Sequence, residues 1–243
     1  MHTPRSALRL GLAAAATSLV AGCSMITNSS SAAPSSSSAT TTASPATRSA
    51  VPLSGSQLAG ILLPVSSMPS GFKLNPAGTR NTESQLPSDT AKPVPASQVC
   101  KALTQTAFLR VAGIDTGDWA QGDFLSAGQS QEVNEEIDIF TGTDAQKAMT
   151  TLWQEFGTCS SFSYQSNGTT APSTLTRSLL AGVGDEGIEA VIVSPVFEGG
   201  QTIVAIRMGS QVITTMYSSS GKDLGSPAVG YAEQIAQRLR AAE

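Results

Sequence analysis

Histidine is almost absent from this 243-residue sequence, and the one residue present, His2, lies in a leader that is expected to be removed. Without histidine a chain cannot form a Ser-His-Asp or Cys-His nucleophile system or a typical catalytic zinc site, although a rarer lysine-based dyad stays open. The sequence also lacks G-x-x-x-x-G-K-[ST] and a G-x-G-x-x-G motif after a strand. We therefore expect no catalytic residues, no metal site and no cofactor.

Positive charge is also scarce. When Arg5 and Arg9 leave with the leader, 12 of the 14 basic residues remain against 18 acidic ones, a net charge of −6. The chain has no block of like charges. This balance disfavours binding to nucleic acid or to anionic lipids.

The amino terminus carries an export signal. Arg5 and Arg9 precede an apolar stretch from Leu10 to Val20, which is too short to span a bilayer as a mature helix. Val20-Ala21-Gly22-Cys23 then resembles a lipobox, in which the cysteine thiol receives a diacylglyceryl group. We predict a signal peptide over residues 1–22 and lipidation of Cys23, palmitate included. The protein would then be lipid-anchored at the cell membrane, facing the extracytoplasmic side; an ordinary secretory signal with an incidental cysteine is the alternative.

Residues 23–52 are rich in Ser, Thr, Ala and Pro, a composition that cannot bury enough apolar surface to order itself. We expect them to form a disordered tether. Residues 53–243 suit a single domain with a sizeable core.

Within this domain, helices are predicted over residues 54–63, 143–157 and 226–242. The second begins with a capping box, Thr143-Asp144-Ala145-Gln146, and the third with Ser226 as cap before Pro227. Alternating patterns predict seven strands, over residues 118–126, 131–140, 161–165, 174–180, 187–197, 201–208 and 211–217. Residues 75–95 are interpreted mainly as a surface loop, and residues 181–187 as a loop between strands. The expected fold class is α+β, an antiparallel sheet flanked by helices.

Besides Cys23, the chain has only Cys100 and Cys159. An oxidising compartment favours a disulfide between them. A redox-active thiol is the alternative, although no C-x-x-C spacing supports it.

An acidic run comprises Glu132, Glu135, Glu136 and Asp138. The period of two places Glu132, Glu136 and Asp138 on one face of a strand. We interpret this face as solvated, with Val133, Ile137 and Ile139 packing inward. A calcium site or a carboxylate pair for glycoside hydrolysis is the functional alternative. Trp119 and Trp153 could line a pocket, but core positions are more common for such residues.

Several landmarks resemble the PknH-like extracellular sensor domain of actinobacterial receptor kinases and lipoproteins. They are Leu62-Leu63-Pro64, Cys100 at the start of a short helix, Phe156 three residues before Cys159, and Ile235-Ala236 in the closing helix. The family usually has tryptophan at the position of Phe156 and two further cysteines in the late strands. The resemblance implies an antiparallel sheet flanked by helices, a Cys100–Cys159 disulfide and a cleft for an unidentified extracytoplasmic ligand. It carries over no ligand-binding residue.

The sequence therefore favours a non-catalytic lipoprotein that is attached to the membrane through its lipid anchor and binds an unknown extracytoplasmic ligand or envelope protein. It predicts no nucleic-acid partner. The alternatives are a cell-wall glycoside hydrolase that uses the acidic run, and a structural or adhesion lipoprotein.

Overall fold

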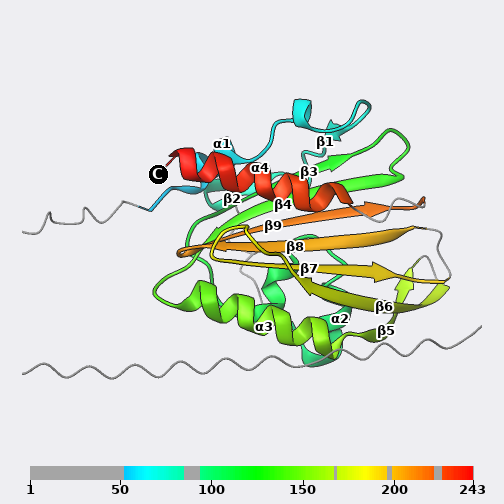
Figure 1. Cartoon of the computed structure of the whole chain (residues 1–243). Helices are drawn as coiled ribbons and strands as arrows, with labels where there is room; N and C mark the ends of the chain where they lie inside the picture. The colour runs from blue at the N-terminus through cyan, green and yellow to red at the C-terminus, as the bar shows by residue number, and fades with distance from the viewer. Residues whose placement is uncertain (1–51, 85–93, 167–168, 196–198, 222–225, 243) are drawn as a thin grey trace, which may run out of the picture. The chain divides into compact units, whose positions relative to one another are not determined.

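The structure, a computed structural model, describes residues 52–84, 94–166, 169–195, 199–221 and 226–242. They form an α+β domain in which helices lie on both faces of a nine-stranded antiparallel sheet (Figure 1). The expected fold class is confirmed. The predicted signal peptide, Cys23 and nearly all of the predicted tether lie outside the described residues.

The strands follow the order β1-β3-β4-β9-β8-β7-β6-β5, and β2 also pairs with β3. Their bounds are β1 Lys73–Leu74, β2 Arg80–Asn81, β3 Trp119–Leu125, β4 Gln131–Ile139, β5 Ser161–Ser166, β6 Thr169–Leu179, β7 Glu186–Val193, β8 Gly200–Met208 and β9 Gln211–Ser219. All seven predicted strands are present. β1 and β2 are additional and lie within or next to the predicted surface loop.

Helices pack on both faces of the sheet. Their bounds are α1 Gly55–Ile61, α2 Val99–Ala102, α3 Asp144–Thr158 and α4 Ser226–Ala242, with short 3-10 turns η1 Val65–Ser67, η2 Thr82–Ser84, η4 Ala96–Gln98 and η5 Phe108–Ala112. On one face, here called the α4 face, α4 packs on β8 and β9 while α1 packs on β3. On the opposite face, the α3 face, α3 packs on β6, β7, β8 and η5. Among the described residues, no helix has the length and apolar character needed to cross a bilayer.

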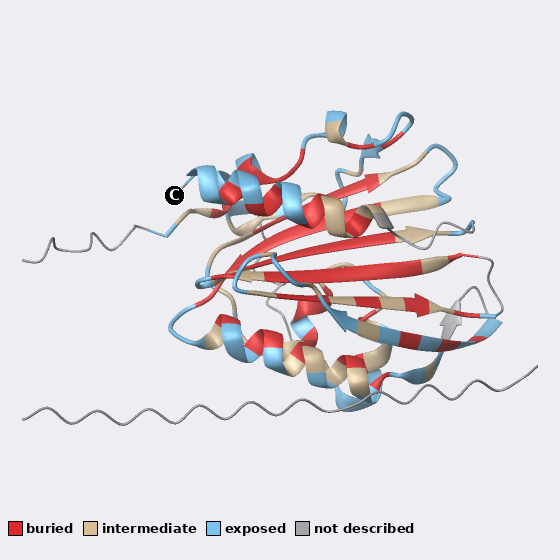
Figure 2. Cartoon of the chain, viewed as in Figure 1, coloured by how far each residue is buried: buried red, intermediate tan, exposed pale blue. Residues whose placement is uncertain are grey.

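Each face has its own apolar core, because the two helices carry apolar stripes of helical period. The buried residues of α3 are Ala145, Ala148, Met149, Leu152 and Phe156. The fully buried residues of α4 are Ala228, Ala232, Ile235 and Leu239. The central strands β8 and β9 are buried along most of their length, whereas β6 alternates between buried and exposed residues (Figure 2). A sheet covered in this way requires strands that are apolar on both sides.

The predicted capping box at Thr143 is wrong. Thr143 precedes α3, but its φ of −100° and ψ of 11° are not extended, and its side chain makes no capping hydrogen bond. The extended conformation is what lets a capping side chain reach back to the amides of the first turn. A capping box exists instead at α1, where extended Ser54 accepts from the Gln57 amide and the Gln57 side chain accepts from the Ser54 amide.

Cys100 and Cys159 form a disulfide with an S–S distance of 2.04 Å. It joins α2 to the residue that follows α3. The bond closes a sequence separation of 59 residues and fixes the α2 segment beside the α3 core.

Candidate functional site

Four acidic side chains lie together on the α3 face of β3 and β4. We call them the acidic row: Asp123, Glu132, Glu136 and Asp138. In the β3–β4 register, Gln121 lies opposite Glu136, Asp123 opposite Asn134, and Trp119 opposite Asp138. Residues directly opposite each other in an antiparallel pair share a face, so the acids and amides form one continuous polar strip.

The interpretation of this face as solvated is wrong. Only 3% of Asp123, 6% of Glu136 and 4% of Asp138 is exposed, and the two amides, Gln121 and Asn134, are equally buried. Val133 and Ile137 on the other side of β4 are also fully buried. Strand β4 is thus enclosed on both faces, and the expected alternation between wet and dry sides is absent.

Hydrogen bonds satisfy the acidic row only in part. Asn75 Nδ2 donates to Asp123 Oδ2 at 2.6 Å, and Gln121 Nε2 donates to the Gly78 carbonyl at 2.9 Å. Gly78 lies so close to Asp123 that a Cβ at this position would collide with the carboxylate. By contrast, three oxygens have no hydrogen-bond partner: Asp123 Oδ1, Glu136 Oε2 and Asp138 Oδ2. Buried polar atoms are satisfied in the great majority of cases, so three such atoms on one strip mark it as unusual.

Burial also raises the pKa of every member of the row. It raises the pKa of Glu132 to about 7, helped by the neighbouring Asp123 charge. It raises the pKa of Glu136 to about 7 despite the guanidinium groups of Arg80 and Arg110, which lower it. For Asp138, burial and then the Glu136 charge raise the pKa well above its ordinary value. Burial raises the pKa of Asp123 and outweighs its hydrogen bonds to Asn75 and to the neighbouring Glu132 carboxyl, which lower it.

Two arginines and one tryptophan border the row. Arg80 lies opposite Gln121 in the β2–β3 register, and its guanidinium carbon is 5.9 Å from the centroid of the Trp119 ring. Arg110 comes from η5. Among the described residues, neither arginine forms an ion pair within 4.0 Å of an acid in the row. The two cations therefore act on Glu136 through space, without donating a hydrogen bond to it.

Arg110 also lines a recess of about 280 Å³. Its wall comes from residues 94–110, from just before η4 to the start of η5, and includes Gln98, Lys101 and Thr106. Ala107, another lining residue, has a φ of +55°, the left-handed conformation that a residue with a Cβ rarely adopts. Because Arg110 borders the recess and also lowers the pKa of Glu136, the recess and the acidic row share one charged side chain.

Glu135, the fourth member of the acidic run, points to the opposite face. It is fully buried on the α4 face, and neither of its carboxyl oxygens has a hydrogen-bond partner. Burial raises its pKa to about 8, although the nearby Leu63 amide and the Arg238 guanidinium lower it. The run thus divides between two environments, as the period of two predicts.

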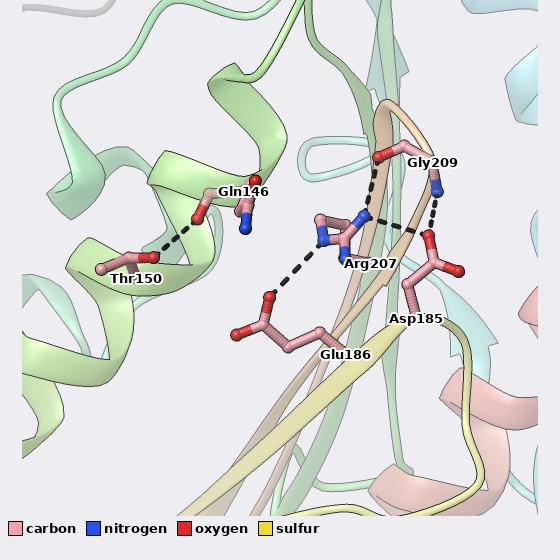
Figure 3. Close-up of polar contacts among 6 residues, drawn as sticks. All are labelled: Gln146, Thr150, Asp185, Glu186, Arg207 and Gly209. Atoms are coloured by element: carbon pink, nitrogen blue, oxygen red, sulfur yellow. Dashed lines mark hydrogen bonds and ion pairs between the residues drawn. The ribbon is translucent and has the colours of Figure 1, made fainter. Parts of the chain in front are cut away.

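A satisfied ion cluster elsewhere in the sheet shows the contrast. Arg207 donates to Asp185 Oδ2 at 3.0 Å and lies 3.5 Å from Glu186 Oε2, while the Gly209 amide donates to the same Asp185 oxygen at 2.7 Å (Figure 3). This cluster ties the β6–β7 loop, correctly predicted as a loop, to the β8–β9 turn. Gly184 belongs there because its φ is +59° and a Cβ would collide with the Arg207 carbonyl. The acidic row has no comparable partner set.

The two tryptophans take different roles. Trp153 lies on α3 and is half-buried against the core of the α3 face. The Arg177 guanidinium stacks 4.0 Å from its ring centroid and donates to the Trp153 carbonyl. Trp119 borders the acidic row instead, so it is the tryptophan that lies near the candidate site.

Sequence reasoning found Glu132, Glu136 and Asp138 but missed Gln121, Asp123, Asn134, Arg80 and Arg110. The polar side chains of β3 recur at every second residue, which predicts a shared face. No local signal gives the β3–β4 register that sets them beside Glu136. Within the described residues, no three His, Cys, Asp or Glu side chains are placed to hold a metal ion.

Comparison with solved structures shows a similar fold in the extracellular domain of PknH from Mycobacterium tuberculosis. The TM-score is 0.61 at 12% sequence identity, and the match covers 79% of this chain and 98% of that one. At this identity the likeness concerns the fold alone. No protein-family model and no curated protein matches the sequence.

Proposed function

We propose that this chain is a membrane-anchored cell-envelope lipoprotein whose folded domain binds a ligand or protein partner outside the cytoplasm, without catalysis. The observation that carries the binding role is the acidic row, with three buried carboxyl oxygens that lack partners. Leaving such an atom unsatisfied costs about 1–3 kcal/mol. A bound molecule that donates hydrogen bonds would remove this cost.

The location of the row supports a binding role over a purely structural one. A structural carboxylate normally accepts hydrogen bonds from donors in the fold, as Asp185 does from Arg207 and Gly209. Strongly perturbed carboxyl groups concentrate at functional sites, because binding and chemistry require groups that the fold alone leaves unmatched. The acidic row fits this second description.

Three observations support the extracytoplasmic location. Val20-Ala21-Gly22-Cys23 has the form of a lipobox. The Cys100–Cys159 disulfide suits an oxidising compartment. The similar fold belongs to a domain described as extracellular. Two acyl chains on Cys23 would hold the domain stably at a membrane surface.

Metabolic labelling tests the anchor. Cells that express the full chain are grown with radiolabelled palmitate, and the label on the protein is compared between the natural chain and Cys23→Ala. We expect the label to be lost in Cys23→Ala and retained in Ser24→Ala, the matched control. Label that persists in Cys23→Ala would contradict the anchor.

Amide NMR tests the binding role. The purified full-length chain is titrated with a small-molecule extract of the cell envelope. We expect chemical-shift changes centred on β3 and β4 that Glu136→Gln weakens and Asp144→Asn, at an exposed end of α3, leaves unchanged. No response to any extract, or a response that ignores Glu136→Gln, would count against the proposal.

Glycoside hydrolysis is the enzymatic alternative, since Glu136 and Asp138 lie on one strand face. Such enzymes need one carboxylic acid and one ionised carboxylate, set by environments that move the two pKa values apart. Here burial raises the pKa of both groups. Turnover of a cell-wall polysaccharide that Glu136→Gln abolishes would nevertheless favour the hydrolase and overturn our proposal.

A further inference from the structure

The spacing of two acids in the row defines what could satisfy them. Glu136 and Asp138 lie two residues apart on one face of β4, so their Cα atoms are about 7 Å apart. Glu136 Oε2 and Asp138 Oδ2 are both buried and both lack a partner. Two unpaired acceptors on neighbouring positions of one strand face are suited to share a single donor group.

The charges around this pair favour a cationic donor. The row contains four carboxyl groups, and the described cations that act on Glu136 are Arg80 on β2 and Arg110 on η5. Full ionisation therefore leaves two uncompensated negative charges on a buried strip. Both arginines are exposed, and Arg80 lies over the Trp119 ring, so neither occupies the space between the two carboxyls as an ion-pair partner.

The donor set argues against a bare metal ion. Hard divalent cations take six or more oxygen ligands, usually with several carboxylates around one point. Among the residues with described positions, no three acidic, histidine or cysteine side chains converge in this way. An ammonium group needs only directed acceptors, and it carries three donors that can be shared among carboxylates.

We propose that the acidic row binds the ammonium end of an organic amine, with Glu136 and Asp138 as its two acceptors. This inference rests on the proposed binding function and names the chemical class of its ligand. Trp119 lies opposite Asp138 in the register, so an aromatic ring borders the same position, and the Arg80 guanidinium lies 5.9 Å from its centroid. Binding forms two charge-assisted hydrogen bonds and releases to solvent the protons that the carboxyls hold.

The pH dependence follows from this proton release. Burial raises the pKa of Glu136 to about 7, so at pH 5.5 the ligand must displace a proton that is absent at pH 8. Asp123 on β3 and Glu132 on β4 share the face and add negative charge as they ionise, while Arg80 and Arg110 remain charged throughout. An alkylamine also stays protonated over this range. The affinity should therefore rise at least about tenfold from pH 5.5 to pH 8.

The test uses three probes of matched length on the purified full-length chain: 1,4-diaminobutane, its neutral isostere 1,4-butanediol and the dianion succinate. Calcium and magnesium chloride are titrated in parallel. Isothermal calorimetry in buffers of different ionisation enthalpy gives the dissociation constant and the number of protons released. We expect saturable binding of 1,4-diaminobutane alone, with proton release below pH 7.

The variants locate the site. Glu136→Gln and Asp138→Asn should each weaken 1,4-diaminobutane binding at least about tenfold at pH 8, as expected for the loss of a charge-assisted bond. Asp144→Asn, which removes an acid from the exposed start of α3, should leave the affinity unchanged. Circular dichroism confirms the fold of each variant, and two independent substitutions keep the test valid if one variant does not fold.

Several results would overturn the inference: equal binding of 1,4-butanediol, affinity that does not change with pH, equal loss in Asp144→Asn, or binding of calcium or magnesium through the row in place of the amine. The proposed function is tested separately. If no amine binds while envelope extract still shifts the β3–β4 amides, the amine inference fails and the binding role stands. If neither produces a response, both fail.

Discussion

The α3 face of this sheet has an apolar half and a polar half. Its apolar half, formed by β6, β7 and β8, packs Leu175, Ile188 and Ile203 against α3. Its polar half, formed by β3 and β4, carries the acidic row. Both halves are buried, so both have lost contact with water. Loss of water contact stabilises the apolar half, whereas the polar half loses hydration that its hydrogen bonds replace only in part.

The difference shows how a fold can separate stability from function. The apolar half can hold the sheet together through α3 and the disulfide. The polar half is then free to keep groups whose pKa values are raised and whose hydrogen bonds are incomplete. Substitutions should therefore affect the halves differently: in the apolar half they should lower stability, and in the polar half they should change pH dependence and binding.

The largest expected effect comes from the disulfide beside the apolar half. Cys100→Ala with Cys159→Ala should lower the free energy of unfolding by about 4 kcal/mol if the bond acts through chain entropy. The loop is long, with a sequence separation of 59 residues, so the unfolded chain regains much freedom. Urea unfolding measures the loss. Reduction of the natural chain should give a similar value, and a loss below about 1 kcal/mol would contradict the role given to this bond.

The core of the apolar half comes next. Leu152 on α3 is fully buried, so Leu152→Ala should cost about 3 kcal/mol through lost burial and the cavity left behind. In the polar half, Glu136→Gln at pH 5 should cost less than about 1 kcal/mol, because the amide has nearly the same shape as the protonated carboxyl. Chemical unfolding of both variants under the same conditions checks the comparison. Equal losses would mean that the halves do not differ in this way.

The change of stability with pH should come largely from the carboxyl groups of the polar half. Burial raises the pKa of Glu132 and Glu136 from the ordinary 4.5 of an exposed glutamate to about 7 in the folded state. Between these values the folded state holds more protons than the unfolded state, so stability is full below pH 4.5 and falls as the pH rises to about 7. Glu132→Gln with Glu136→Gln should remove much of this fall, because an amide does not titrate in either state.

Glu135 sharpens that prediction, because its pKa is raised to about 8 on the opposite face. Glu135→Gln should reduce the fall over a wider window, from about pH 4.5 to about pH 8, and between pH 7 and pH 8 its contribution should be larger than that of Glu132 and Glu136. Melting curves collected from pH 4 to pH 9 separate the two contributions. A profile unchanged by all three substitutions would show that these acids are not buried in the folded protein.

A smaller loss than that of Leu152→Ala is expected for a charge within the apolar half. Arg177→Lys should lower stability by about 1 kcal/mol, because lysine cannot stack its planar group on Trp153 while donating to the Trp153 carbonyl. Arg240→Lys, at an exposed position of α4, is the matched control. Unfolding followed by tryptophan fluorescence measures both. A loss in the control as large as in Arg177→Lys would remove the stacking explanation.

Much of the fold could be predicted because the two-residue alternation of the strands and the helical spacing of apolar residues in α3 and α4 are visible within short stretches of sequence. Gly209-Ser210 marks the β8–β9 turn, and the apolar stripe of α3 is unambiguous. β1 and β2 could not be predicted, because each has two residues and exists only through pairing with β3, more than 35 residues away. The capping box at Thr143 failed because its motif does not determine the backbone conformation.

The candidate site shows the same limit. The period of two correctly placed Glu132, Glu136 and Asp138 on one face. Their burial could not be predicted, because it depends on distant segments such as residues 75–81, which lie against β3. A charged strand face is usually wet, so the local pattern favoured a solvated interpretation. In the structure, segments that are distant in the sequence cover this face, so the face is buried.

A carboxyl titration of the free protein, followed by carbon NMR, tests the central claim most directly. If the acidic row is a buried and unsatisfied strip, Glu132 and Glu136 should titrate with midpoints near 7. Midpoints near 4.5 for both residues, the ordinary value for glutamate in water, would show that the row is an ordinary solvated face, and the binding site proposed there would not exist.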